Sequence, residues 1–140
     1  MTGPIQPFHL AIPVKDLASS LAFYRDLLGC ETGRSSDRWI DFNFFGHQLV
    51  VHLDDSKTEN VINQVDGHQI PIPHFGVVLT LADWYKLESR LREYDFQFEV
   101  EPYVRFKGEV GEQATMFFRD PSGNALEFKA FKDLQSLFSK

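Results

Sequence analysis

Cysteine is almost absent from this chain of 140 residues, since Cys30 stands alone. A lone cysteine cannot form an intramolecular disulfide, which excludes a small disulfide-held scaffold and favours a reducing compartment. The sequence also lacks a basic-then-apolar leader at its start, and no apolar run approaches the ~20 residues that a membrane-spanning helix needs. We therefore expect a cytoplasmic protein that makes no membrane contact.

Basic residues are too few to favour a nucleic-acid partner. The sequence has 14 Lys and Arg against 20 Asp and Glu, a formal net charge of -6 at pH 7, whereas a phosphate backbone is bound by a basic patch. Phenylalanine, in contrast, is abundant, with 14 residues and pairs at Phe44-Phe45 and Phe117-Phe118. Such pairs suit strands that present aromatic side chains on both faces of a sheet.

The first half of the chain predicts a strand, a helix and then further strands. Residues 8–14 read FHLAIPV, which is typical of a short buried strand. Asp16 follows as the N-cap of a helix whose apolar residues recur at helical spacing, and Gly29 supplies the stop. Two strand-like runs come next, over 39–45 and 48–53.

The second half repeats this order of elements. Residues 74–81 predict a strand, and Asp83 is expected to cap a second helix with one apolar face. Three further strands are expected at 96–100, 114–119 and 125–131. The repetition indicates an internal duplication, although few positions match residue by residue.

The two halves predict an α+β fold of two βαβββ modules in a single domain over residues 1–140. Module one covers about 5–55, and module two covers about 74–131. The stretch at about 54–73 is polar and rich in turn residues, so we expect a linker there. A short helix at about 133–139 is expected to pack on the body of the protein or on a second chain.

A histidine opens each half, and the two histidines are 65 residues apart. Because equivalent strands of a duplicated sheet occupy matching places, His9 and His74 are expected to face each other. Glu127 alternates with apolar Leu126 and Phe128 on the final strand, so it faces a cavity if they face the core. Each of the three alone also fits an ordinary packing or surface role, and their joint placement favours a metal site. Two imidazoles and one carboxylate leave positions open on a divalent ion; Fe(II) is preferred, and Mn, Ni, Co and Zn are compatible.

Three segments carry a resemblance that covers nearly the whole chain: FHLAIPVKDLASSLAFYRDLLGC, PHFGVVL and RDPSGNALEF. They resemble the vicinal oxygen chelate superfamily, which holds glyoxalase I, fosfomycin-resistance thiol transferases, bleomycin-binding proteins and extradiol dioxygenases. The chain is similar to a small single-domain branch described as extradiol-type dioxygenases. The resemblance implies a half-open, U-shaped β-barrel around a metal held by His9, His74 and Glu127, and it implies a homodimer.

The chain departs from the family's pattern at a fourth ligand position. Glyoxalase I has a carboxylate on the last strand of its first module, and counting from Gly46 as from Gly123 places Val50 there. His52 follows two residues later on the same face of the strand. Three alternatives stay open for His52: a fourth metal ligand, a catalytic acid/base or substrate contact, and simple packing. We favour the catalytic role.

Substrate-binding residues are expected near the last three strands. Arg105 and Lys107 would neutralise an anionic substrate, although cations on an edge strand also commonly face solvent. The acid/base His and Tyr of ring-cleaving relatives are missing, so Glu112 becomes a candidate for contact with substrate. Phe117 stands where those relatives have the tyrosine, and we expect it to line the pocket.

The candidate metal ligands and the resemblance together imply a metal-dependent, extradiol-like dioxygenase that acts on a small oxygenated or aromatic anion chelating the ion. One alternative is a non-redox Lewis-acid enzyme, either a glyoxalase-type isomerase or a fosfomycin-type thiol transferase. The other is a small-molecule-binding resistance protein. The expected partners are a small-molecule substrate and a second copy of the chain, with no nucleic acid.

Overall fold

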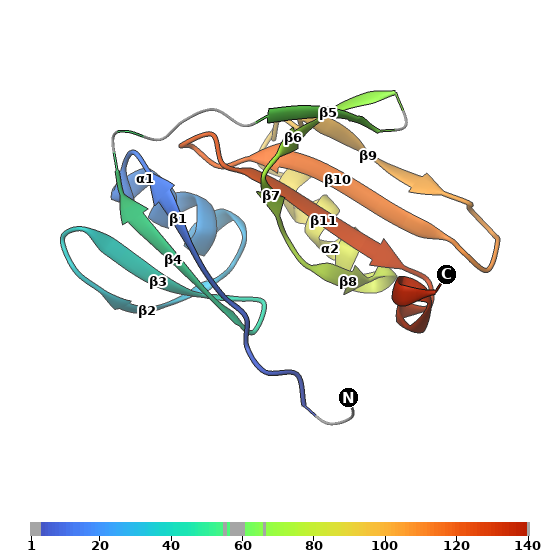
Figure 1. Ribbon diagram of the computed structural model, residues 1–140, viewed down its shortest axis with the longest axis horizontal. Coiled ribbons are helices and arrows are strands. Elements are labelled where there is room, and N and C mark those ends of the chain that lie inside the picture. The colour runs from blue at the N-terminus through green and yellow to red at the C-terminus, as the bar shows by residue number, and fades with distance from the viewer. Residues whose placement is uncertain (1–3, 55, 57–60, 66, 140) are drawn as a thin grey trace. The chain divides into compact units, whose positions relative to one another are not determined.

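The computed structural model describes residues 4–54, 56, 61–65 and 67–139. The chain divides into two compact units, Met1–Thr58 and Glu59–Lys140 (Figure 1). Unit 1 holds one sheet, unit 2 holds a main sheet and a separate two-stranded sheet, and a helix packs against one face of the sheet of unit 1 and of the main sheet of unit 2. None of the helices in the described part of the chain has the length and apolar character needed to cross a membrane.

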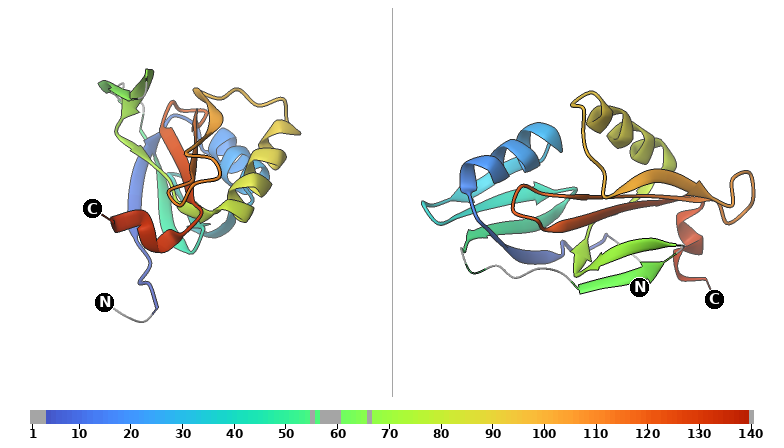
Figure 2. Two further views of the ribbon diagram at one scale, coloured as in Figure 1. Left: turned by 90° about the vertical axis from the view of Figure 1, so that its right-hand side faces the viewer. Right: turned by 90° about the horizontal axis from the view of Figure 1, so that it is seen from above.

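Unit 1 contains four strands in the order β1-β4-β3-β2. Strand β1 runs parallel to β4, and the other pairs are antiparallel. The short helix α1 continues into the π-helical turn η1, and both lie on one face of the sheet (Figure 2). The elements are β1 (His9–Val14), α1 (Leu17–Leu21), η1 (Ala22–Leu27), β2 (Glu31–Ser35), β3 (Trp39–Phe44) and β4 (His47–Leu53).

Local sequence explains the placement of β1 and its helix. Asp16 caps α1 as expected, because its Oδ2 accepts from the Ser19 N–H at 2.7 Å. Gly29 adopts a φ of 81° after the last turn, a conformation that favours glycine at a helix end. Alternation along β1 buries Ile12 and Val14 and leaves His9 on the opposite, exposed face.

Unit 2 repeats the topology of unit 1. Its sheet has the order β7-β11-β10-β9, and β8 continues the line of β7 by pairing with β11 in parallel. A separate hairpin, β5–β6, precedes the sheet. The elements are β5 (Val61–Val65), β6 (His68–Ile72), β7 (His74–Phe75), β8 (Val78–Thr80), α2 (Leu81–Arg92), β9 (Val100–Arg105), β10 (Gln113–Arg119), β11 (Ala125–Phe131) and the 3-10 helix η2 (Leu134–Phe138).

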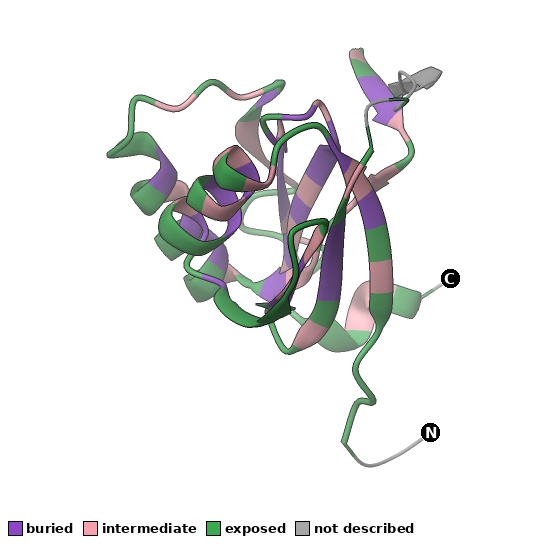
Figure 3. Cartoon of the chain, turned by 90° about the vertical axis from the view of Figure 1, so that its left-hand side faces the viewer, coloured by how far each residue is buried: buried purple, intermediate pink, exposed green. Residues whose placement is uncertain are grey.

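Helix α2 covers one face of this sheet. Trp84, Leu87 and Leu91 are its buried residues, and the Trp84 indole N–H donates to the Phe128 carbonyl at 2.9 Å. Figure 3 shows the resulting division of each helix into a buried side and an exposed side. Because the other face of the sheet is left uncovered by α2, polar side chains of the strands can gather there.

The expected cap of the second helix is wrong by three residues. Thr80, not Asp83, is the N-cap: its backbone is extended, and its Oγ1 accepts from the Asp83 N–H at 3.2 Å. Asp83 instead lies in the first turn, where its negative charge favours the helix N-terminus.

The α+β fold of two βαβββ modules is confirmed, with three differences in detail. The region expected as a linker forms the β5–β6 hairpin, whose reversal at Gly67 (φ 78°) suits glycine; positions 55, 57–60 and 66 of that region lie outside the described residues. Strand β2 was not predicted, because this exposed edge strand has no apolar alternation in its sequence. The strand expected at 96–100 begins only at Val100 and continues to Arg105.

Candidate metal centre and its cavity

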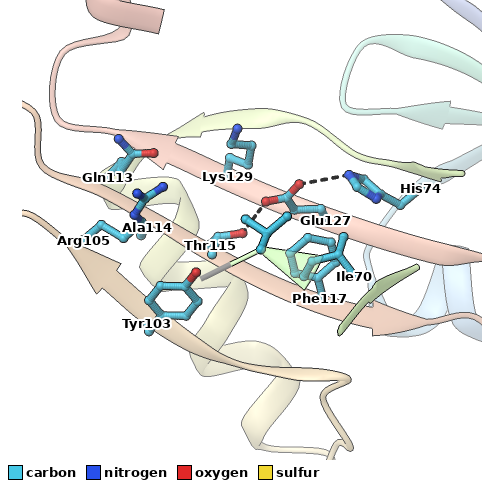
Figure 4. A pocket seen from close by; sticks show the side chains of 11 residues that line it. Ile70, His74, Tyr103, Arg105, Gln113, Ala114, Thr115, Phe117, Glu127 and Lys129 are labelled. Carbon is cyan, nitrogen blue, oxygen red and sulfur yellow. Dashed lines mark hydrogen bonds and ion pairs between the residues drawn. The ribbon is translucent and has the colours of Figure 1, made fainter. Parts of the chain in front are cut away.

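His74 and Glu127 lie side by side on the sheet of unit 2. His74 pairs with Ala125, and Glu127 is two residues further along β11. The His74 Nε2 is 3.2 Å from the Glu127 Oε1 (Figure 4). Their side chains are 27% and 14% exposed, so the pair is largely withdrawn from water yet reachable from one side.

A glycine makes this close approach possible. Gly76 lies between β7 and β8, and a Cβ at that position would lie 1.6 Å from the backbone oxygen of Glu127. No side chain fits there, because ordinary van der Waals contact begins at 3.4 Å. Strand β7 can therefore lie against β11 at this point only with glycine at position 76.

Two neighbours fix the orientation of the pair. The His74 Nδ1 is 2.8 Å from the Pro71 carbonyl oxygen, which only accepts, so Nδ1 carries the hydrogen and Nε2 faces Glu127. The Thr115 hydroxyl donates to the Glu127 Oε2 at 2.6 Å. This is the arrangement that orients metal ligands in proteins, where the second ring nitrogen and the second carboxylate oxygen are held by hydrogen bonds.

His74 and Glu127 also shift each other's pKa. The hydrogen bond to Glu127 raises the pKa of His74, against a smaller opposing effect of burial. Burial acts to raise the pKa of Glu127, but hydrogen bonds from His74 and Thr115 and the charge of Lys129 outweigh it, and that pKa lies below its usual value. Without an ion the two groups favour an imidazolium and a carboxylate.

His9, the third expected ligand, belongs to unit 1. It is exposed there on β1, and its Nδ1 is 2.7 Å from the Gln48 Oε1. Since an amide oxygen only accepts, Nδ1 is the donor and Nε2 is the nitrogen left to coordinate. In both His9 and His74, Nδ1 is hydrogen-bonded to an acceptor oxygen and Nε2 is the nitrogen that could coordinate an ion.

Strand register decides which residue of unit 1 corresponds to Glu127. His9 pairs with Gln48 as His74 pairs with Ala125, so the residue two positions on is Val50 in unit 1 and Glu127 in unit 2. Val50 is an apolar side chain without a donor atom. The register agrees with the sequence count that leaves the first module without a carboxylate ligand.

His52 lies two residues beyond Val50 on the same face of β4 and is exposed. It pairs with Pro13 on one side and Trp39 on the other. In unit 2 the corresponding position is Lys129, which pairs with Val78 and Thr115. Register therefore gives His52 no ligand-equivalent place, and its catalytic role stays a prediction.

The donor chemistry fits a divalent ion. Two imidazole nitrogens, which are borderline donors, together with one carboxylate, which is a hard donor, suit Fe(II), Mn, Co, Ni or Zn. Unit 2 holds the His74–Glu127 pair; no group of three or more His, Cys, Asp or Glu side chains gathers within reach of one ion among the described residues. Of the three expected ligands, His74 and Glu127 lie together, and the part of His9 in the site stays a prediction.

A cavity of about 160 Å³ opens beside the pair within unit 2. It is much smaller than the ~300–1,000 Å³ of typical sites for drug-sized ligands, so it suits a small molecule. Its wall combines apolar, cationic and hydroxyl-bearing side chains (Figure 4). The lining residues are Val65, Ile70, His74, Tyr103, Arg105, Gln113, Ala114, Thr115, Phe117, Glu127 and Lys129.

Of the four expected substrate-binding residues, two line this cavity. Arg105 and Phe117 are part of its wall. Lys107 is exposed in the loop between β9 and β10, outside the lining. Glu112 lies in the same loop, where its Oε1 accepts from the Gly108 N–H at 3.0 Å and holds the turn.

Sequence reasoning missed four polar residues of this wall, Tyr103, Gln113, Thr115 and Lys129. Thr115 and Lys129 alternate with Phe117 and Glu127 on β10 and β11, so period-two spacing from the expected ligand would have found them. Tyr103 lies on a strand that was expected to end before it. Its place required the register of β9, which the sequence does not reveal.

The comparisons with known proteins agree with this architecture. Residues 6–128 match the model of the Glyoxalase/Bleomycin resistance protein/Dioxygenase superfamily. The chain belongs to this superfamily. A solved superfamily structure, described as glyoxalase/bleomycin resistance protein/dioxygenase from Alicyclobacillus acidocaldarius, is 34% identical, with 99% of this chain and 100% of that chain covered and a TM-score of 0.79.

Two more distant superfamily structures share the fold. A fosfomycin resistance protein from Listeria monocytogenes is 18% identical, covers 96% of this chain and 98% of its own, and has a TM-score of 0.69. A lactoylglutathione lyase from Agrobacterium tumefaciens is 19% identical, covers 99% and 100%, and has a TM-score of 0.66. The superfamily assignment suggested by the sequence is confirmed.

Proposed function

We propose that the chain is a metal-dependent enzyme that holds one divalent ion through His9, His74 and Glu127. Its substrate would be a small anion with two adjacent oxygens that chelate the ion. The oriented His74–Glu127 pair at the edge of a small cavity carries this proposal. Both histidines present Nε2, the nitrogen that their Nδ1 hydrogen bonds leave available.

Dioxygenase chemistry with Fe(II) is the first candidate. A bound ion would polarise the chelating oxygens of the substrate and, as Fe(II), would also supply electrons to dioxygen. The residues of the chain would orient the ion's ligands and shape the cavity. Thr115 holds the orientation of the Glu127 carboxylate, and Phe117 offers an aromatic face to a flat substrate. The ring centroid of Phe117 is 5.1 Å from that of His74, so the Phe117 ring lies next to the proposed ion site.

A Lewis-acid enzyme without oxygen chemistry is the second candidate. Phe117 lies directly opposite Glu127 on the neighbouring strand, and its side chain has no proton to give. Protonation of a ring-cleavage product is therefore not served from that position. An isomerase or transferase that needs only polarisation of substrate oxygens does not require such a group there.

Oxygen consumption separates the two candidates. Protein reconstituted anaerobically with Fe(II) is mixed with air-saturated buffer and a panel of catechols and hydroxylated acids, with a Glu127→Gln variant as the matched control. We expect substrate-dependent oxygen uptake by the wild type and none by the variant. If no compound of the panel causes oxygen uptake, the dioxygenase proposal is wrong. Turnover of glutathione adducts by Ni- or Zn-loaded protein would support the second candidate.

We also propose that two chains associate. The 3-10 helix η2 exposes apolar side chains, with Leu134 44% and Phe138 89% exposed. Such residues on a terminal helix suit contact with a second copy. Light scattering of the wild type and of a Phe138→Ser variant tests this, and a wild-type mass of one chain contradicts it.

A further inference from the structure

We propose that the cavity of unit 2 contains a second anion-binding subsite, formed by Lys129 and Arg105, and that the substrate is a small diacid. This inference rests on the proposed function, because the first acidic end of the molecule would chelate the ion at His74 and Glu127. The second acidic end would lie further along the same sheet face.

Strand register places these residues on one face in successive rows. Phe117 and Glu127 form the first row, and Thr115 pairs with Lys129 and Tyr103 in the second. Rows two residues apart are separated by about 7 Å along a strand. Lys129 therefore lies one row beyond the proposed metal ligand.

Arg105 extends the positive charge beyond Lys129. It pairs with Gln113 in the third row, at the end of β9, and its side chain lines the same cavity. Figure 4 shows the order along the cavity, with His74 and Glu127 at one end, Lys129 and Thr115 between, and Arg105 with Gln113 at the other. The positive charge of the cavity wall thus begins at Lys129, one row from Glu127, and continues to Arg105 at the end away from the pair.

Both cations are placed against aromatic rings. The Lys129 Nζ is 5.8 Å from the centroid of Phe131, and the Arg105 guanidinium carbon is 5.2 Å from that of Phe106. A ring face orients a cation without cancelling its charge, so the N–H groups keep their attraction for an anion.

Apolar and aromatic side chains line the cavity beside these rows. Ile70, Val100 and Phe117 form a buried cluster with Tyr103 packed against it, and three of these four line the cavity. The Tyr103 ring is also stacked on His68 of the β5–β6 hairpin, with 5.3 Å between centroids. The middle of the ligand is therefore a short hydrocarbon segment.

These features together define the substrate class. One end is a 2-oxo or 2-hydroxy carboxylate, whose adjacent oxygens chelate an ion in a five-membered ring. The other end is a carboxylate or phosphonate about 7 Å away, the spacing of one row along β11. A five-carbon diacid matches this length and the small cavity.

A pair of probes that differ in one carboxylate tests the subsite. Co(II)-loaded full-length protein is titrated with 2-oxoglutarate and with 2-oxopentanoate, and the visible absorption of Co(II) reports chelation. We expect both acids to change the spectrum and the diacid to bind about tenfold to hundredfold more tightly, because it gains charge-assisted hydrogen bonds. Lys129→Met and Arg105→Met should each reduce this preference at least about tenfold.

The matched control is Lys86→Met, which removes one positive charge from the exposed side of α2; it should keep the preference of the wild type. Equal affinities for the two acids, or a preference retained in both cavity variants, would overturn the subsite while leaving metal chelation intact. No spectral change with either acid would overturn the substrate class. Failure of Co(II) to bind at all would instead overturn the proposed function.

Discussion

Replacing Gly76 with alanine is expected to damage the His74–Glu127 site from a position outside the cavity lining. The new Cβ would lie 1.6 Å from the Glu127 backbone oxygen and 2.6 Å from its carbonyl carbon. Ordinary contact begins at 3.4 Å, so the two strands must separate by about 1.8 Å at this point. That displacement is more than half of the 3.2 Å that joins the His74 Nε2 to the Glu127 Oε1.

The expected cost follows from this displacement. Overpacking typically costs about 1–3 kcal/mol of unfolding free energy, and we expect the upper part of that range because backbone atoms must move. Displacement of one ligand should also weaken divalent-metal affinity by at least about tenfold. Urea unfolding of the metal-free protein measures the first effect, and competition with a chromogenic chelator measures the second.

Gly111→Ala is the matched control, because a Cβ there would meet open space. This variant should match the wild type in stability and in metal affinity. If Gly76→Ala also matched the wild type in both measurements, the close approach of β7 to β11 would not be what positions Glu127.

Three other perturbations test the site and its support. Thr115→Val removes the hydroxyl that donates to Glu127 and should weaken metal affinity several-fold, as chelator competition would show, whereas Thr115→Ser should retain it. In metal-free protein the raised pKa of His74 contributes stability that is fully present below pH 6.5 and is lost as the pH rises through the pKa of His74 in the folded state. The lowered pKa of Glu127 contributes stability that is present above pH 4.5 and is lost on acidification. The difference in unfolding free energy between wild type and Glu127→Gln should therefore peak between these pH values, at about 1 kcal/mol, and a flat profile would contradict the pair. Asp120→Ala should cost about 2–4 kcal/mol in urea unfolding, because the buried carboxylate accepts from the N–H groups of Ser122 and Asn124.

Periodicity in the sequence predicted the modules because the strands and helices that were predicted each carry an apolar pattern of their own. The apolar alternation of β11 predicted both its limits and the direction of Glu127. The first helix was found from its cap, since Asp16 is followed at once by helical spacing. The second cap was misplaced because Thr80 and Asp83 are both good capping residues, and only the backbone geometry separates them.

The β5–β6 hairpin and the cavity wall depend on pairing between strands, which the sequence alone does not reveal. The β5–β6 hairpin has a polar, turn-rich sequence, so no buried pattern marked it as structure. The cavity wall depends on the register that sets Tyr103 opposite Thr115 and Thr115 opposite Lys129. Register is fixed by tertiary packing, which is why Arg105 was expected from its charge whereas Lys129 was missed.

We propose that His74 and Glu127, together with His9, bind one divalent ion. Elemental analysis of the full-length protein purified without added metal tests it most directly, with His9→Asn, His74→Asn and Glu127→Gln as variants and His68→Gln as the matched control. We predict about one ion per chain in the wild type and in His68→Gln, and a loss of most of it in each of the other three. A wild type without bound ion that also takes up none on reconstitution, or full occupancy in the His74 and Glu127 variants, would contradict the account.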